Sequence, residues 1–176
     1  MAPSDVLLKT AKAYLNALST VDGNGIAAIT ADSFYVTIAP NSTGLSGQDG
    51  ISVDRDSLIQ RFHGLKAVLS SMNVKIEKEW PPNEASNQVT LWTTANADFH
   101  PQIVGDDSKD DWVFKPETLF IFTMDESGEK VKHLFEFQDS VAVQSMNAVF
   151  GKAMEMLGHA MPGNDQCTTP PCVPSG

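Results

Sequence analysis

Glu136 is the side chain of this sequence whose surroundings most favour proton-transfer chemistry. It lies between Phe135 and Phe137 in residues 130–138, a segment with the aromatic and β-branched character of a strand. Burial among such neighbours would raise the pKa of its carboxyl toward the range useful to a general acid or base. The alternative is that Glu136 faces water at a sheet edge or pairs with a cation across a subunit interface.

The histidines form a second set of titratable groups, because an unperturbed imidazole changes charge near neutral pH. His63 follows Phe62 in a helix-like segment and is a candidate acid or base, with Phe62 as an apolar contact for a ligand. A hydrogen-bonded or solvent-facing histidine is the alternative. His100 precedes Pro101, where either a pocket mouth or an ordinary loop is expected. His133 alternates with aromatic residues, which indicates packing in a sheet or interface.

Four larger aromatic residues carry a polar atom that a ligand could use. Tyr35 could donate a hydrogen bond to a carbonyl or a developing enolate, or it could be a half-buried core tyrosine. Trp80, Trp92 and Trp112 offer large apolar surfaces on strands or at strand edges. They would line a cavity or fill the core, and we expect one or two of them to contact ligand.

The sequence carries no signature of a metal or nucleotide site. Its four histidines show no short His-x-His spacing, and there is no Cys-x-x-Cys. Glycine-rich nucleotide loops and the G-x-S-x-G elbow of serine hydrolases are also missing. The acidic segment 106–111 is best interpreted as solvated surface. We therefore expect a site without a metal.

Charge and composition limit the partners of the chain. Its 176 residues, 41% of them hydrophobic, suffice for one domain, predicted over residues 1–158 with a flexible Pro-rich tail over 159–176. Cys167 and Cys172 fall in this tail and cannot cross-link the core. A net charge of −10 disfavours nucleic acid and anionic membranes but permits a small neutral or cationic ligand. Without a membrane-spanning run or a signal peptide, we expect a cytoplasmic protein.

The elements that must position these residues follow from hydrophobic periodicity. Helices are predicted over residues 4–18 and 25–31, from Asp54 or Asp56 to Leu69, and from Asp139 or Ser140 to Leu157. Strands are predicted over residues 33–38, 74–80, 88–99, 117–124 and 130–138, with loops over 40–50 and 100–111. Early helices followed by a strand meander indicate an α+β protein whose antiparallel sheet curls around the helices.

The hairpin formed by residues 117–124 and 130–138 is apolar on both faces. Alternation places Phe120 and Phe122 on one face and Ile121 on the other, while Glu136 shares a face with Leu134. Both faces must therefore be covered, one by helices and the other by a second subunit or by the last helix. We expect a homodimer that pairs through the outer face.

Several features resemble the fungal SnoaL-like branch of the nuclear-transport-factor-2-like (NTF2-like) superfamily, over roughly residues 5–150. They are the order of elements, the loop after Ala39-Pro40-Asn41, the Gly64-Leu65 pair, and above all FTMDESGEKVKHLFEFQDS. The most specific part is the end of the last hairpin, with its Gly turn, Lys-Val, Glu-Phe and Asp-Ser. The resemblance implies a cone, in which a curved sheet wraps around helices and encloses a pocket.

The same resemblance implies a function. Family members include polyketide cyclases, dehydratases and isomerases that generally work without cofactors, and they commonly dimerise through the outer sheet face; some have no chemistry. Glu136 and Glu117 match acids that recur in the family, although Glu117 could merely cap a strand end. We expect an isomerase, cyclase or dehydratase acting on a hydrophobic carbonyl compound, with Tyr35 or His63 polarising the oxygen inside the cone. The alternative is a carrier with the same pocket.

Overall fold

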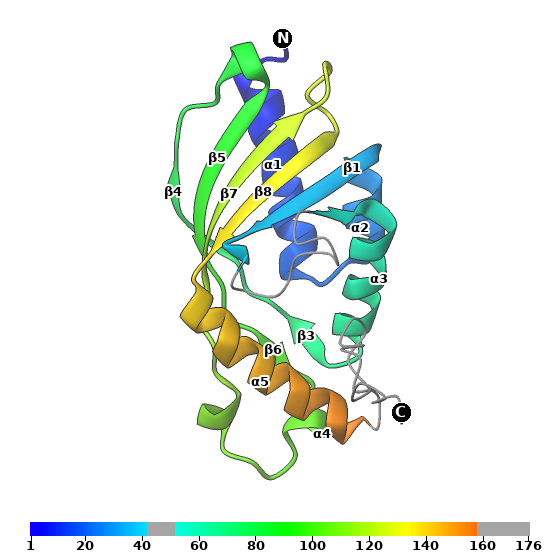
Figure 1. Ribbon diagram of the computed structural model, residues 1–176, viewed down its shortest axis with the longest axis vertical. Coiled ribbons are helices and arrows are strands. Elements are labelled where there is room, and N and C mark those ends of the chain that lie inside the picture. Colours follow the sequence, from blue (N-terminus) through cyan, green and yellow to red (C-terminus); the bar gives the residue numbers. More distant parts are fainter. Residues whose placement is uncertain (42–51, 158–176) are drawn as a thin grey trace, which may run out of the picture.

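A six-stranded sheet forms the frame of the protein (Figure 1). The computed structural model describes residues 1–41 and 52–157, and in it the strands follow the order β2-β1-β8-β7-β5-β4. Neighbouring strands are antiparallel, apart from the parallel pair β1 and β8. The strands are β1 (Thr30–Ala39), β2 (Val53–Asp54), β4 (Lys75–Glu79), β5 (Gln88–Thr94), β7 (Glu117–Met124) and β8 (Val131–Gln138). The α+β class with a curved, mainly antiparallel sheet is thereby confirmed.

Three helices cover one face of this sheet, which we call the inner face (Figure 1). They are α1 (Ser4–Ser19), α2 (Gly23–Ile29) and α3 (Arg55–Lys66). The apolar stripe of α1 includes Leu7, Ala11, Tyr14 and Leu15, all buried. Helix α3 starts where predicted, because the carboxylate of Asp54 accepts a hydrogen bond of 2.8 Å from the backbone N–H of Ser57.

The pairing of β7 with β8 decides which side chains face these helices. Phe120 lies opposite Glu136, and Phe122 lies opposite Leu134. Phe120, Phe122 and Leu134 are buried, so this set occupies the inner face. The residues between them project from the outer face. The predicted division of the hairpin into two faces is confirmed, and Glu136 lies on the inner one.

A smaller layer closes one end of the molecule. It contains β3 (Leu69–Ser71) paired with β6 (Asp98–Phe99), and the helices α4 (Pro101–Val104) and α5 (Ser140–Met156). Helix α5 runs from the end of β8 to α4 (Figure 1). Its Phe150 contacts Phe99 and Phe114, with ring centroids 5.6 and 5.5 Å apart. Lys152 forms a 2.6 Å ion pair with Asp107. Helix α5 therefore packs at the end of the sheet.

Several predicted boundaries are wrong. The strand expected over residues 88–99 ends at Thr94 and resumes as β6 in the second sheet, because the backbone N–H of Asn96 bonds to Met72 instead of a β7 residue. The third helix ends at Lys66, so buried Val68 and Leu69 lie beyond it, and Leu69 pairs with Phe99. The second helix begins two residues earlier than expected. The expected loop over 100–111 contains α4 and most of a 3₁₀ helix, η3 (Lys109–Trp112). A second 3₁₀ helix, η2 (Glu84–Ser86), precedes β5.

Some expectations fall outside the described residues. They are the tail over 159–176, with Cys167 and Cys172, and most of the loop over 40–50. Within the described ranges, none of the helices combines the length and hydrophobicity that crossing a bilayer requires.

The turn between β7 and β8 sets the register of Glu136. Gly128 adopts a φ of +77°, which favours glycine, and its backbone N–H donates to the carbonyl of Asp125 at 3.1 Å. The carbonyl of Gly128 accepts a 2.7 Å hydrogen bond from the Thr10 hydroxyl of α1. A shift of one residue would move Glu136 to the outer face, so this turn is part of the site's construction.

We expect Gly128→Ala to destabilise the protein by roughly 1–3 kcal/mol. A Cβ at this position would lie 2.5 Å from the Cβ of Ala2, in a backbone conformation that disfavours alanine. Gly151→Ala is the matched control, because it lies in α5 with no atom within 4 Å of the added Cβ, and it should gain about 0.5–1 kcal/mol. Chemical denaturation measures both; equal stability of the two variants would contradict the proposed importance of the turn.

Candidate functional site

Glu136 projects from the inner face between two buried apolar side chains. Its neighbours across the sheet are Ile38 of β1 and Phe120 of β7. Glu136 itself is partly buried, and its Oε2 accepts a 2.9 Å hydrogen bond from the side-chain amide of Gln138. The carboxyl therefore has one fixed polar partner in apolar surroundings.

These surroundings change the acidity of the carboxyl. Loss of hydration on burial raises the pKa of Glu136 from 4.5 to about 7, despite the opposing effects of the Gln138 amide and the positive charge of Arg61. Near neutral pH the side chain consequently exists in both protonation states. A group in this condition can accept and return a proton without a large energetic cost in either direction.

Arg61 brings a positive charge to the same interior. It lies on α3 and is partly buried. Burial lowers the pKa of Arg61, while the negative charges of Glu136 and Asp54 raise it. Arg61 remains a guanidinium cation at any physiological pH. It can therefore stabilise the carboxylate form of Glu136 or a negative charge that develops on a nearby ligand.

Tyr14 approaches the same region from α1. Its ring lies 5.4 Å from that of Phe122 and 6.4 Å from that of Phe34, measured between centroids. Burial, and then the charge of Glu136, raise the pKa of the Tyr14 phenol well above its ordinary value. The phenol is thus a neutral hydrogen-bond donor. Together, Glu136, Arg61 and Tyr14 provide a proton carrier, a fixed cation and a donor; we call them the interior polar cluster.

Tyr35 does not belong to this cluster, and its expected position inside the cone is wrong. Strand β1 buries Phe34, Val36 and Ile38 on the inner face, so Tyr35 projects from the other side and is 44% exposed. There its ring stacks on His133, with centroids 4.3 Å apart. The packing role expected for His133 agrees with this contact.

Glu117 is also on the outer face. It is the first residue of β7 and is exposed, and its side chain alternates with the buried Thr118. Its backbone carbonyl accepts a 3.1 Å hydrogen bond from Asp139 at the start of α5. This position agrees with the strand-end alternative and separates Glu117 from Glu136.

The other two candidate histidines lie away from the interior polar cluster. His63 is exposed and lies beside Gly23 of α2; it is two residues from Arg61, so their side chains leave α3 in nearly opposite directions. His100 is partly buried, with its Nε2 3.1 Å from the carbonyl of Lys66, where it links α4 to the end of α3. Phe62, in contrast, is buried in the core.

The three tryptophans occupy three different environments. Trp92 is 37% exposed on the outer face, beside Leu119. Trp80 follows the edge strand β4, with the Lys78 ammonium 4.7 Å from its ring centroid. Trp112 is buried, with the Lys152 ammonium 4.4 Å from its ring. Trp112 also lines a hollow in the described part of the chain.

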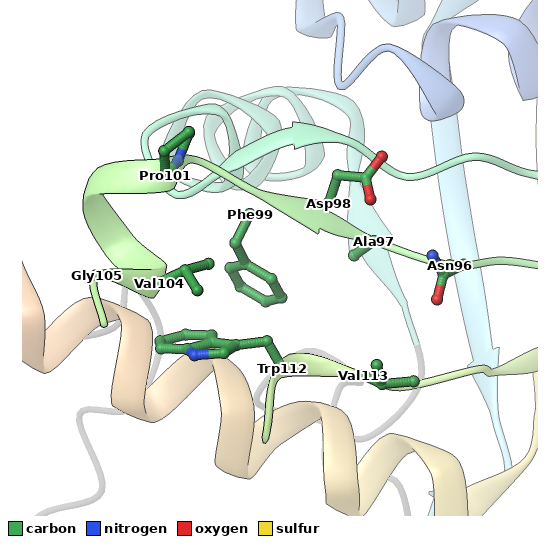
Figure 2. A pocket seen from close by; sticks show the side chains of 9 residues that line it. All are labelled: Asn96, Ala97, Asp98, Phe99, Pro101, Val104, Gly105, Trp112 and Val113. Atoms are coloured by element: carbon green, nitrogen blue, oxygen red, sulfur yellow. The ribbon is translucent and has the colours of Figure 1, made fainter. Parts of the chain in front are cut away.

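This hollow, which we call the Trp112 pocket, has a volume of about 460 Å³ (Figure 2). It is lined by residues 96–99, Pro101, Val104, Gly105, Trp112 and Val113. The rings of Phe99 and Trp112 approach each other, whereas the carboxylate of Asp98 points the other way (Figure 2) and is held by Ser71 and Asn73. The Trp112 pocket is therefore mainly apolar, and none of the interior polar cluster lines it. It offers a surface for a ligand, and its one carboxylate, Asp98, is held by Ser71 and Asn73.

Two members of the interior polar cluster escaped the sequence interpretation. The hydrophobic periodicity of residues 4–18 places Tyr14 in an apolar helix stripe, and that of the third helix places Arg61 on its polar edge. Strand alternation places Gln138 on the same face as Glu136, but it does not predict the hydrogen bond between the two side chains. The sequence carries only a weak indication of this cluster. A phenolic or charged residue on the side of a helix that faces the sheet can approach an acid that a strand buries on the same side.

Nothing in the described residues forms a metal site, since no three His, Cys, Asp or Glu side chains lie close enough to hold an ion. A cofactor with phosphate groups would find one cation, Arg61, in the interior polar cluster. The described arrangement therefore offers acid–base and electrostatic chemistry from its own side chains.

Three solved structures resemble this protein over most of their length. BvnE pinacolase from Penicillium brevicompactum matches with a TM-score of 0.69 and 16% identity, covering 85% of this chain and 96% of that one. PrhC from Penicillium brasilianum matches with a TM-score of 0.69 and 18% identity, covering 88% and 95%. An NTF2-like protein from Burkholderia xenovorans matches with a TM-score of 0.54 and 14% identity, covering 82% and 97%.

Neither a protein-family model nor a curated protein sequence matches the chain. The structural likeness, at identities below 20% for these three proteins, establishes architecture alone. The chain has the NTF2-like fold, in which a curved sheet wraps around α1, α2 and α3.

Proposed function

We propose that this protein is a cofactor-independent enzyme that moves a proton next to a carbonyl group in a hydrophobic biosynthetic intermediate. Isomerisation, cyclisation and dehydration all belong to this chemistry. The observation that carries the proposal is the position of Glu136, whose carboxyl has a pKa of about 7 on the apolar inner face of the sheet. An acid so placed destabilises the fold when ionised, and proton transfer explains why it is there.

The reaction follows from the two protonation states of Glu136. As a carboxylate it takes a proton from the carbon next to the carbonyl, and the electrons of the C–H bond pass to the oxygen as an enolate. The protonated Glu136 then returns the proton to another carbon, which gives an isomer, or to a leaving hydroxyl, which departs as water. Arg61 stabilises the transient negative charge, and the surrounding apolar side chains exclude water.

The structural neighbours support this class of function. One is described as a pinacolase, and PrhC and AusH, like it, come from the filamentous fungi Penicillium and Aspergillus. A further neighbour is described as an LEH-like epoxide hydrolase from M. tuberculosis. We propose that the chain is a SnoaL-like enzyme of fungal secondary metabolism and that it works in the cytoplasm. At these identities the neighbours support no residue-by-residue transfer of roles.

A carrier that binds the same ligand without altering it is the second candidate. It is favoured by the Trp112 pocket, which has a mainly apolar lining and contains none of the interior polar cluster. Native mass spectrometry of the protein purified from its own host separates the two functions. A carrier retains one unaltered ligand, whereas an enzyme releases its product.

We expect Glu136→Gln to abolish proton transfer. The measurement is deuterium uptake from D₂O at the carbon next to the carbonyl in a panel of bicyclic ketones, followed by mass spectrometry. The variant should exchange at least about a hundredfold more slowly than the wild type, because Gln cannot accept the proton. Glu117→Gln is the control, since Glu117 is exposed on the outer face, and it should retain full exchange. Exchange by Glu136→Gln within a few fold of wild type would remove Glu136 from the mechanism.

The raised pKa of Glu136 also predicts a pH-dependent stability. Between pH 4.5 and about 7 the folded protein holds a proton that the unfolded chain releases, so the wild type loses stability as pH rises through this window. Glu136→Gln does not titrate. Its stability advantage should therefore be small at pH 4.5 and grow to at most about 3 kcal/mol above pH 7.5.

Thermal unfolding at several pH values measures this advantage. Glu117→Gln again serves as the control and should show no such growth across the window. An advantage of Glu136→Gln that is the same at pH 5 and pH 8 would contradict the raised pKa.

We further propose that the protein works as a homodimer paired through its outer face. On that face, side chains of β5, β7 and β8 lie opposite one another in rows that cross the sheet. The two most apolar rows are Trp92–Leu119–Phe137 and Thr90–Ile121–Phe135. Phe137 is 50% exposed, and α5, the competing cover, packs against Phe99 and Phe114 instead. A patch of this kind is typical of an interface.

We expect light scattering at micromolar concentration to give a mass near twice 19.0 kDa. Ile121→Glu places an unpaired charge in the row Thr90–Ile121–Phe135 of the proposed interface and should yield monomers. Val141→Glu is the control, because Val141 is 72% exposed on α5, and it should remain dimeric. A wild-type mass near 19.0 kDa would overturn the proposed dimer.

A further inference from the structure

One of the two oxygens of the Glu136 carboxyl is held by a neighbouring side chain. The side-chain Nε2 of Gln138 donates a 2.9 Å hydrogen bond to Oε2 of Glu136. Gln138 lies two positions after Glu136 in β8, so both side chains project from the inner face and can meet alongside the strand. The amide N–H stabilises negative charge on Oε2, so a proton is carried more readily by Oε1.

The backbone of Gln138 is fixed from both sides. Gln138 is the last residue of β8 and pairs with Thr118 of β7. The next residue, Asp139, donates its backbone N–H to the carbonyl of Glu117 at 3.1 Å, and its carboxylate accepts a 2.9 Å hydrogen bond from the backbone N–H of Val141. Strand β8 thus leads directly into α5 (Figure 1). The amide therefore reaches the carboxyl from a rigid part of the fold.

The hydrogen bond from Gln138 also determines how the carboxyl is oriented. Burial raises the pKa of Glu136 to about 7, and the Gln138 amide and the positive charge of Arg61 both oppose that rise. A charge acts over a distance and in any orientation of the carboxyl. A hydrogen bond, in contrast, requires one particular oxygen to lie about 3 Å from the nitrogen and nearly in line with the N–H. The bond to Gln138 therefore distinguishes the two carboxyl oxygens, which the charge of Arg61 does not.

We propose that Gln138 is a positioning residue, whose amide holds Oε2 of Glu136 so that Oε1 is the atom that takes the proton from the substrate and returns it. This inference rests on the proposed function. In the first step a bond forms between Oε1 and the proton as the C–H bond next to the carbonyl breaks, and the electrons of that bond pass to the carbonyl oxygen. In the second step Oε1 returns the proton to a carbon of the enolate. Because the carboxyl is held, Oε1 approaches the substrate from one side.

The experiment compares Gln138→Met with Gln88→Met. Methionine is close to glutamine in size but has no side-chain N–H, so the first variant loses the bond to Glu136. Gln88 is the matched control, because it is also partly buried in the sheet and its Nε2 donates to the hydroxyl of Thr123 at 3.2 Å, on the outer face. The reaction is deuterium uptake from D₂O by the bicyclic ketone that the wild type exchanges fastest. Gln138→Leu repeats the test if Gln138→Met folds poorly.

The first expected result concerns acidity and needs no substrate. Without the amide the carboxylate loses a hydrogen bond, so the pKa of Glu136 should rise from about 7 to about 8 in Gln138→Met. In protein labelled with ¹³C at the glutamate side-chain carboxyl, Glu136→Gln assigns the Glu136 signal, and its NMR titration gives this pKa. The acid limb of the kcat/KM profile for exchange should move to higher pH by the same amount. Gln88→Met should move neither.

The second expected result concerns orientation. At about pH 9.5, where Glu136 is ionised in both proteins, kcat of Gln138→Met should be about tenfold below that of wild type with KM nearly unchanged, because a carboxyl that turns freely spends less time in the productive orientation. The wild type should place the first deuterium at one of the two hydrogens of the CH₂ group next to the carbonyl. Gln138→Met should place it at both, and Gln88→Met should behave as wild type.

Three results overturn the inference. They are a Glu136 signal that titrates in Gln138→Met as in wild type, a wild-type kcat at about pH 9.5, and an unaltered choice between the two hydrogens. A fall in Tm without these changes would show that the amide is purely structural. Failure of the proposed function is distinguishable, because Glu136→Gln then exchanges as fast as wild type while the titration of Gln138→Met still shows the raised pKa.

Discussion

The burial of one carboxyl against an apolar sheet face is the interaction on which the rest of this structure depends. Glu136 reaches that position because β7 and β8 pair in a register that places it beside Phe120, between two strands whose inner residues are apolar. The side-chain period of a strand is two, so no intermediate arrangement exists. With a shift of one residue Glu136 would face water with an ordinary acidity, and Phe135 would enter the core. The turn at Gly128 and its hydrogen bond to Thr10 therefore determine chemistry as well as topology.

The two faces of this hairpin were predictable from the sequence because both depend on local alternation. The grouping of Glu136 with Leu134 on one face and the packing role of His133 followed from rules that act over a few residues. The same rules left open whether that face is the inner one, and whether Asp54 or Asp56 caps α3. The break of the strand after Thr94 was not predictable in this way. Residues 95–99 are as compatible with a longer strand as with two short ones, and their hydrogen bonds to Met72 and Leu69 are long-range.

The choice between the two tyrosines shows why the site was harder to predict than the fold. Tyr35 lies in a strand, and its face depends on the parallel pairing of β1 with β8, between residues about a hundred positions apart in the chain. Tyr14 fits the apolar stripe of α1 perfectly, so a sequence pattern reads it as core. Both residues satisfy their local pattern, and only the tertiary arrangement separates a surface phenol stacked on His133 from an interior phenol near Glu136.

The interior polar cluster also explains how the fold tolerates its own acid. Its three members come from α1, α3 and β8, so no local interaction brings them together, and each is disfavoured alone in an apolar interior. Glu136 is less costly than a fully ionised carboxylate because it can hold its proton up to about pH 7, and Gln138 and Arg61 offset part of the remaining cost. Stronger interactions with the Glu136 carboxylate would stabilise the protein further. They would also lower the pKa of Glu136 to its ordinary value, so that it could no longer exchange a proton near neutral pH. A proton-transfer site therefore requires that the cost of burying Glu136 be only partly offset by its neighbours. A protein selected for stability alone would have replaced the acid with an apolar residue.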